Sequence, residues 1–172
     1  MNPWHKKLIL IFSVLSLIFF FIGFFSPEST DIHPMYKLGF GDACFIFLFN
    51  TINILIMFAI SLLGISPIFL FKFIFGMGAG WQSVGGSPWL YYAASLIHGL
   101  LEWIVILIVF IFTIEHFQFL ISYFMKKKNA EQLKKFYFKT CVRTVPLAVF
   151  ILLISALVEV YISNRLLIFL SK

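Results

Sequence analysis

Residues 89–125 read WLYYAASLIHGLLEWIVILIVFIFTIEHFQFLISYFM, and this stretch decides the fold. It is apolar almost throughout, and its only carboxylates are Glu102 and Glu115. A helix rises about 1.5 Å per residue, so this run is longer than one crossing of a membrane requires. We therefore expect a helix that either projects beyond the membrane or breaks near His98 and Gly99.

The whole chain has the same apolar character. Of its 172 residues, 62% are hydrophobic and 12% are charged, and the mean hydropathy is +1.03. A globular domain is about 45–50% apolar and about 25% charged. A chain with so little polar surface cannot cover itself in water, which excludes a soluble enzyme, a disordered tail and a secreted disulfide scaffold.

The sequence predicts a single all-α membrane domain over residues 1–172, with about five crossings, the N-terminus inside and the C-terminus outside. The first apolar run resembles a signal peptide, but Phe24 spoils any cleavage site, so we interpret the run as an uncleaved span. Cys44 and Cys141 then lie on opposite sides of the membrane and cannot pair. The predicted spans are 8–26, 43–63, 65–84, 88–113 with an extension to 125, and 144–162.

Positive charge is concentrated in residues 126–143, which are predicted to form a cytoplasmic loop. The block contains seven basic residues and one acidic residue, Glu131, so it carries the whole net charge of +6. Because cytoplasmic loops are rich in Lys and Arg, the block sets the orientation. It is also the expected docking surface for a cytoplasmic partner such as an ATPase, or for anionic lipid, and not for nucleic acid. Its basic residues are Lys126, Lys127, Lys128, Lys134, Lys135, Lys139 and Arg143.

Polar and ionisable residues inside the spans are the candidate functional residues. His98 and Glu102 are four residues apart and share one helix face, about 15 Å and about 21 Å from the outer interface. Glu159 lies nearer the outer face, so direct contact with Glu102 requires a tilted or broken helix. Asn50 and Asn53 are expected to form interhelical hydrogen bonds. The predicted polar cluster comprises Asn50, Asn53, His98, Glu102 and Glu159.

Three chemical interpretations of His98, Glu102 and Glu159 are open. A metal site could use these side chains, but the His-Glu-x-x-His spacing is absent, and we expect neither a metal nor another cofactor. A nucleophile-based peptidase would need a serine or cysteine with a base, and no Gly-x-Ser-x-Gly elbow is present. The favoured interpretation is a buried polar cluster that locks helices together or lines a small polar cavity.

Other residues of the spans have expected structural roles. Gly76 and Gly80 form Gly-x-x-x-Gly, which lets another helix backbone approach closely. Residues 64–67, Gly-Ile-Ser-Pro, are predicted to form a tight turn at the inner side of the membrane. Lys72 lies about 10 Å from this inner turn and is expected to reach back to it as an anchor. Glu115 and His116 are expected at the cytoplasmic headgroups. The ATP-binding motif Gly-x-x-x-x-Gly-Lys-Ser/Thr is absent.

Over residues 45–163 the chain resembles the stage II sporulation protein M family, a group of small polytopic bacterial and archaeal membrane proteins. Where the family has a proline before the His-Gly pair, this chain has Ile97. Many members also have a proline after the last acidic element, whereas this chain continues with Tyr-Ile-Ser-Asn at residues 161–164. These departures indicate a divergent branch. The resemblance rests on Asn50, on Gly76–Gly80, on Ala156-Leu157-Val158-Glu159 and above all on His98-Gly99-Leu100-Leu101-Glu102.

The resemblance implies a scaffold or conduit subunit in a bacterial cytoplasmic membrane, working with other membrane proteins. The namesake serves in a peptidoglycan-remodelling complex of sporulation. Shorter relatives are encoded in gene clusters for circular bacteriocins, beside an ATPase and other membrane proteins that mature, cyclise and export the peptide. The short length of this chain favours this branch. The alternatives are an intramembrane peptidase or peptide cyclase that uses His98, Glu102 and Glu159, and a stand-alone immunity protein or small transporter.

Overall fold

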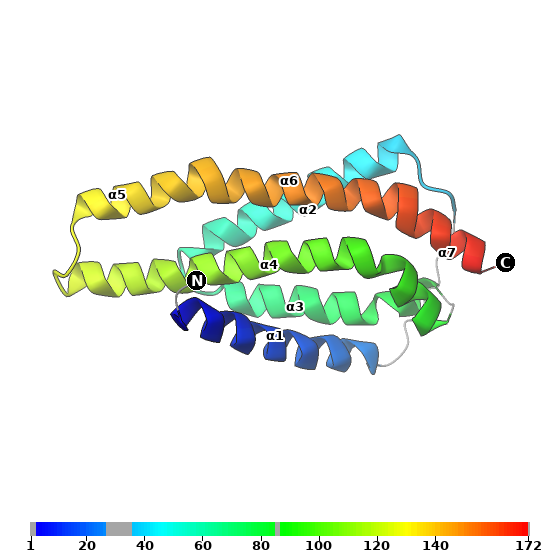
Figure 1. Ribbon diagram of the computed structural model, residues 1–172, viewed down its shortest axis with the longest axis horizontal. Helices are drawn as coiled ribbons and strands as arrows, with labels where there is room; N and C mark the ends of the chain where they lie inside the picture. The colour runs from blue at the N-terminus through cyan, green and yellow to red at the C-terminus, as the bar shows by residue number, and fades with distance from the viewer. Residues whose placement is uncertain (1–2, 27–35, 85–86, 172) are drawn as a thin grey trace.

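Every element of the described chain is helical (Figure 1), which confirms the all-α prediction. The computed structural model describes residues 3–26, 36–84 and 87–171. Its α-helices are α1 (Pro3–Phe24), α2 (Phe40–Ser61), α3 (Ser66–Ala79), α4 (Pro88–Phe124), α5 (Ala130–Lys139), α6 (Val145–Val158) and α7 (Asn164–Leu170). A 3-10 helix, η1 (Gly80–Val84), follows α3, and two π-helical turns, η2 (Thr140–Thr144) and η3 (Glu159–Ser163), flank α6.

Four helices of the described chain are long and apolar enough to cross a membrane, so the protein is a multi-pass membrane protein. They are Trp4–Phe24, Phe40–Ser61, Pro88–Phe124 and the continuous helix Ala130–Leu170. The third predicted span is instead built from two short helices. α3 has 14 residues, fewer than the roughly 20 that a crossing needs, and η1 extends it.

The helix α4 is continuous through His98 and Gly99, so the expected projection is found and the expected break is not. With 37 residues it is about 55 Å long, well beyond a hydrocarbon core of roughly 30 Å. Its last turns pair with α5 in an extension that projects past the start of α1 and the turn between α2 and α3 (Figure 1). We call this extension, residues 112–139, the α4–α5 hairpin.

Residues 126–143 are mostly helical, so the prediction of a basic loop is wrong there. Asn129 and Gln132 cap α5 by accepting hydrogen bonds from each other's backbone N–H groups, at 3.0 and 3.1 Å. The turn η2 then carries the helix into α6 without a break, with the backbone N–H of Val145 donating to the Thr140 carbonyl oxygen five residues earlier. Lysine is a good helix former, so a high density of lysines does not by itself indicate a loop.

The hairpin is tied to the rest of the bundle by His116. This side chain, expected at the headgroups, is only 2% exposed because protein encloses it. Its Nδ1 lies 2.8 Å from the hydroxyl of Tyr137 on α5, and its Nε2 lies 3.3 Å from the carbonyl oxygen of Leu62 after α2. The neighbouring Glu115 accepts a hydrogen bond from His5 of α1 at 2.7 Å. The two residues together therefore connect α4 to three other parts of the chain.

Three buried hydroxyl groups join α4 to the turn between α2 and α3. The Oγ atoms of Ser61 and Ser66 are 3.0 Å apart, and the Thr113 hydroxyl lies 2.8 and 2.7 Å from them. Each of the three residues is at most 1% exposed. Because a buried hydroxyl without a partner is costly, this triangle fixes the depth of the turn relative to α4.

Aromatic rings fill the contact of α1 with α3 and α4. Phe12 is fully buried, and its ring centroid lies 5.9 Å from Phe71, 5.7 Å from Trp103 and 4.8 Å from Phe110. Offset ring pairs at such separations add to the free energy of burial. The abundance of phenylalanine in the sequence thus serves packing between helices as well as contact with lipid.

The helices α1 and α3 approach each other at two glycines. A Cβ atom built on Gly78 would lie 2.0 Å from the carbonyl oxygen of Phe20, and one built on Gly23 would lie 2.0 Å from that of Phe75. The prediction that Gly76 packs against another helix is wrong, because that residue is exposed and a Cβ atom built on it has no neighbour within 4 Å. Gly80 does meet another helix, since its Cβ would lie 2.6 Å from the Tyr91 hydroxyl of α4.

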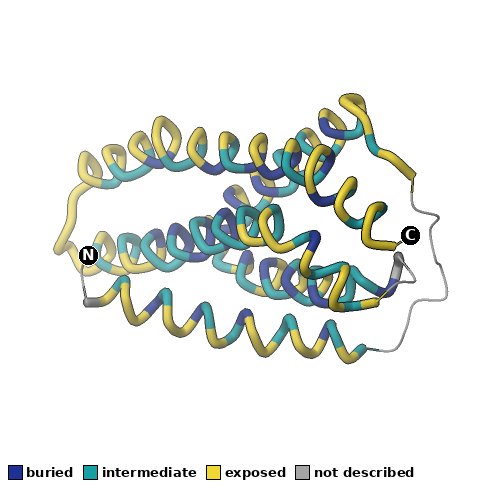
Figure 2. Tube along the Cα trace, turned by 45° about the vertical axis from the view of Figure 1, so that its right-hand side comes forward, coloured by how far each residue is buried: buried dark blue, intermediate teal, exposed yellow. Residues whose placement is uncertain are grey.

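The outer faces of the helices are apolar and exposed (Figure 2), as lipid contact requires. Examples on four different helices, each 58–70% exposed, are Leu10, Phe45, Ile68 and Phe150. Cys44 and Cys141 are both free and exposed. A surface of this kind would aggregate in water, so it is covered by acyl chains or by other apolar helices.

We expect Gly78→Ala to destabilise the protein and Gly76→Ala to leave it stable. The added methyl at position 78 collides with the backbone of α1, and such overpacking costs about 1–3 kcal/mol. The same change at position 76 meets open space and improves helix propensity. Unfolding of both variants in detergent, followed by circular dichroism, measures the difference. Equal stability of the two variants would contradict the packing described for α1 and α3.

Candidate functional site

A cavity of about 390 Å³ lies within the bundle, between α2, α3, α4 and α6. Four of its lining residues are polar, namely Asn50, Asn53, Lys72 and Glu102, and the other walls are apolar. The apolar lining residues are Phe49, Ile54, Met57, Phe69, Leu70, Phe73, Ile106 and Leu152. An apolar pocket with a few convergent polar groups is the usual form of a binding site.

The carboxylate of Glu102 is hydrogen-bonded to α2. Asn50 donates from its Nδ2 to Glu102 Oε1 at 2.9 Å, and both side chains are partly buried. A carboxyl group inside a membrane must face a polar partner or a cavity, and Glu102 does both. The interhelical hydrogen bond expected of Asn50 is therefore present. Asn53, one helical turn further along α2, lines the same cavity.

His98 contacts a different helix from Glu102, although the two residues lie on one face of α4 as expected. The Nδ1 atom of His98 lies 2.9 Å from the hydroxyl oxygen of Ser163, at the end of η3. The hydroxyl of Ser155 on α6 donates to the backbone carbonyl oxygen of His98 at 3.1 Å. Ser155 and Ser163 are both buried. His98 thus fastens α4 to the last transmembrane helix, while Glu102 fastens it to α2.

Glu159 is the first residue of the π-helical turn η3. It lies within electrostatic range of Glu102 and of the Tyr91 hydroxyl. In the described part of the chain, the Glu159 side chain does not form a hydrogen bond with Glu102, Tyr91 or His98. Single π-helical turns occur often at functional sites, because they change which side chains of a helix face its neighbours.

Only part of the predicted cluster therefore comes together at one site. Asn50, Asn53 and Glu102 meet at the cavity, His98 pairs with Ser163, and Glu159 lies near Glu102. Within residues 3–26, 36–84 and 87–171, no group of three or more His, Cys, Asp or Glu side chains is placed to hold a metal ion.

Sequence reasoning missed three residues of this region, Ser155, Ser163 and Tyr91, and it gave Lys72 a different role. A signal for the serines was present, because Ser155, Glu159 and Ser163 follow one another at intervals of four residues. Lys72 is exposed and lines the cavity, so the cavity opens to the surface beside its side chain. The role of Lys72 as an anchor at the inner turn does not account for this position.

Comparison with known proteins returns no match to this chain among family models, curated proteins or solved structures. The resemblance to the stage II sporulation protein M family accordingly stays a prediction.

A double-mutant cycle tests the Asn50–Glu102 hydrogen bond. We expect Asn50→Ala and Glu102→Ala to couple by about 0.6 kcal/mol, the average measured for interhelical hydrogen bonds in membranes. Asn53→Ala provides the matched control, since Asn53 shares the cavity and the helix but forms no hydrogen bond with Glu102. The free energy of unfolding in detergent is the quantity to measure. Equal coupling of Glu102 to both asparagines would contradict the geometry.

Proposed function

We propose that this protein is a membrane subunit of a multiprotein bacterial assembly, in which it acts as a scaffold or conduit. The observation that carries the proposal is the cavity between α2, α3, α4 and α6, with Glu102, Asn50 and Asn53 on its wall and Lys72 at its opening. Ionisable groups at such positions commonly mark substrate pathways or contacts between helices. A polar segment of a peptide could find hydrogen-bond partners there that acyl chains do not offer.

The distribution of charge supports a cytoplasmic docking surface. The α4–α5 hairpin and the start of α1, which carries Lys6 and Lys7, lie at the same end of the bundle (Figure 1). Lys37, just before α2, and Arg165, on α7, lie towards the other end of the bundle (Figure 1). The positive-inside rule then places the hairpin in the cytoplasm. The lysines Lys126, Lys127 and Lys134 are exposed there, where a partner such as an ATPase could bind them.

The pathway is proposed from the resemblance to the sporulation family. Maturation and export of a peptide, such as a circular bacteriocin, is the preferred role, and a sporulation-type complex is the other. In both, the chain resides in the bacterial cytoplasmic membrane and contacts other membrane proteins.

Purification of the tagged chain from its host in mild detergent tests the assembly. We expect an ATPase and further membrane proteins to accompany it in constant ratio, as measured by mass spectrometry. The double variant Lys126→Gln/Lys134→Gln should lose the ATPase and keep the membrane partners. The charge-matched variant Lys37→Gln/Arg165→Gln, at the other end of the bundle, should keep both. A protein that is purified alone and monodisperse would contradict the proposal and favour an immunity protein or a small transporter.

A second candidate function rests on the pair His98–Ser163, whose 2.9 Å separation suits a nucleophile and its general base. In an intramembrane peptidase or peptide cyclase, His98 would accept the Ser163 proton as the oxygen attacks a peptide carbonyl. Because Ser163 is 3% exposed, the helices would have to separate before substrate could reach it. That burial makes a structural hydrogen bond between helices the preferred interpretation.

Substitution of the serine separates the two functions. For a scaffold or conduit, we expect Ser163→Ala and Glu102→Gln to retain peptide maturation wherever the assembly survives, with at most a small loss of stability. For a catalyst, Ser163→Ala should assemble normally and reduce turnover to background. Ser155→Ala is the matched control, since Ser155 binds the backbone of His98 and not its ring. The release of mature peptide per assembled complex is the quantity to measure.

A further inference from the structure

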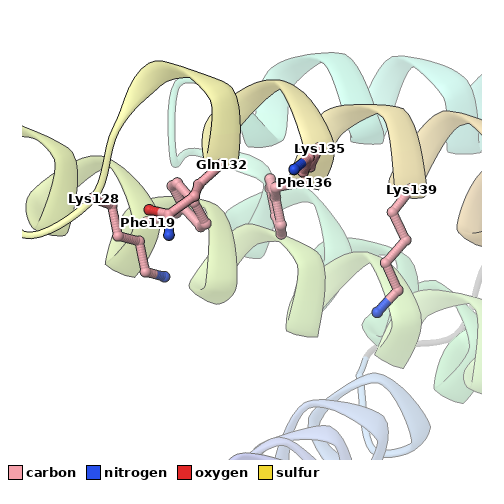
Figure 3. Close-up of a pocket in the computed structure, with 6 residues that line it drawn as sticks. All are labelled: Phe119, Lys128, Gln132, Lys135, Phe136 and Lys139. Carbon is pink, nitrogen blue, oxygen red and sulfur yellow. The ribbon is translucent and has the colours of Figure 1, made fainter.

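The α4–α5 hairpin has a shallow pocket of about 340 Å³ on its surface (Figure 3). The floor is aromatic, because the rings of Phe119 on α4 and Phe136 on α5 stack with their centroids 5.3 Å apart. Three of the lining residues are lysines, and none is acidic. The lining residues are Phe119, Lys128, Gln132, Lys135, Phe136 and Lys139.

Two of the lysines are available to an anion. Lys128 and Lys139 extend from opposite ends of the pocket past the two phenylalanine rings (Figure 3), and the Nζ atom of Lys128 lies 3.8 Å from the centroid of Phe119. Neither lysine forms an ion pair with another side chain of the described chain. Lys135 differs, because its Nζ is 2.8 Å from the carboxylate of Glu131.

We propose that this pocket binds the phosphate headgroup of an anionic membrane phospholipid. Lys128 and Lys139 supply the positive charge, the Gln132 amide supplies a hydrogen-bond donor, and the stacked rings of Phe119 and Phe136 receive the first part of the acyl chains. Paired cationic and apolar groups of this kind are typical of surfaces at the headgroup boundary. A free phosphate ion would use the lysines and leave the aromatic floor without a partner.

The position of the hairpin also favours a lipid. It begins near the start of α1 and the end of α2, at one end of the bundle (Figure 1). Phe124 and Phe138 on the same hairpin are 77% and 69% exposed, so the hairpin has apolar surface beside its lysines, which suits contact with lipid. The hairpin continues in line with α4 and α6 (Figure 1), and the pocket begins at its base, where Phe119 is three residues from the buried His116, so the pocket faces the headgroups of the adjoining leaflet.

Lipid titration in mild detergent tests the site on the full chain. Dioleoylphosphatidylglycerol and dioleoylphosphatidylcholine are added separately, and native mass spectrometry counts the bound lipids. We expect Lys128→Gln/Lys139→Gln to weaken phosphatidylglycerol binding on the order of tenfold or more. The charge-matched variant Lys6→Gln/Lys7→Gln removes two exposed lysines at the start of α1, outside the pocket, and should bind nearly as the unmodified chain does. Circular dichroism establishes that both variants are folded.

Several results would overturn the proposal. Equal weakening by both double variants would show that only overall charge matters, and equal binding of phosphatidylcholine would show that the headgroup charge does not. Displacement of the lipid by an equal concentration of inorganic phosphate, at constant ionic strength, would indicate a site for free phosphate. Unchanged phosphatidylglycerol binding by Lys128→Gln/Lys139→Gln would show that the lipid does not bind in this pocket, and would favour an acidic protein as the ligand of the pocket. None of these results depends on whether the ATPase accompanies the chain.

Discussion

The hydrocarbon core of a membrane offers no hydrogen-bond partners, so the polar side chains of this bundle must find them within the protein. Six of them form pairs between different helical elements. The pairs Asn50–Glu102, His98–Ser163 and His116–Tyr137 join α4 to α2, to the end of η3 and to α5. Apolar contacts can slide with little change in energy, whereas each of these hydrogen bonds fixes one helix against another. The register of the bundle depends on them.

A second kind of contact holds α1. This helix packs against α3 at Gly23 and Gly78 and through the ring of Phe12. Polar contacts are found near its ends, where His5 bonds Glu115 and the carbonyl oxygen of Phe24 accepts from Trp81 Nε1. Close approach of backbones increases van der Waals contact, which is the main attraction available between apolar helices in lipid. The cavity lies at the polar contacts of α4, where the side chains are less closely fitted than at these glycines.

The helix α4 connects the regions for which functions are proposed. It carries His98 and Glu102 in the bundle, Thr113 and His116 at the base of the hairpin, and Phe119 on the floor of the surface pocket. Because it is continuous, a change in tilt at one of these regions moves the others. A partner or lipid bound to the hairpin, as proposed, would therefore contact the same helix that lines the cavity.

The sequence by itself determined the membrane class, the helical architecture, the turn near Gly64 and the shared face of His98 and Glu102. These features follow from local hydropathy and from the 3.6-residue period. Only the tertiary structure decided that Gly78 rather than Gly76 packs against α1, that His98 meets Ser163, and that Lys72 borders the cavity. The physical reason is that these helices are apolar on all sides, so no hydrophobic stripe marks the buried face. Their rotation is set by the neighbours that they contact.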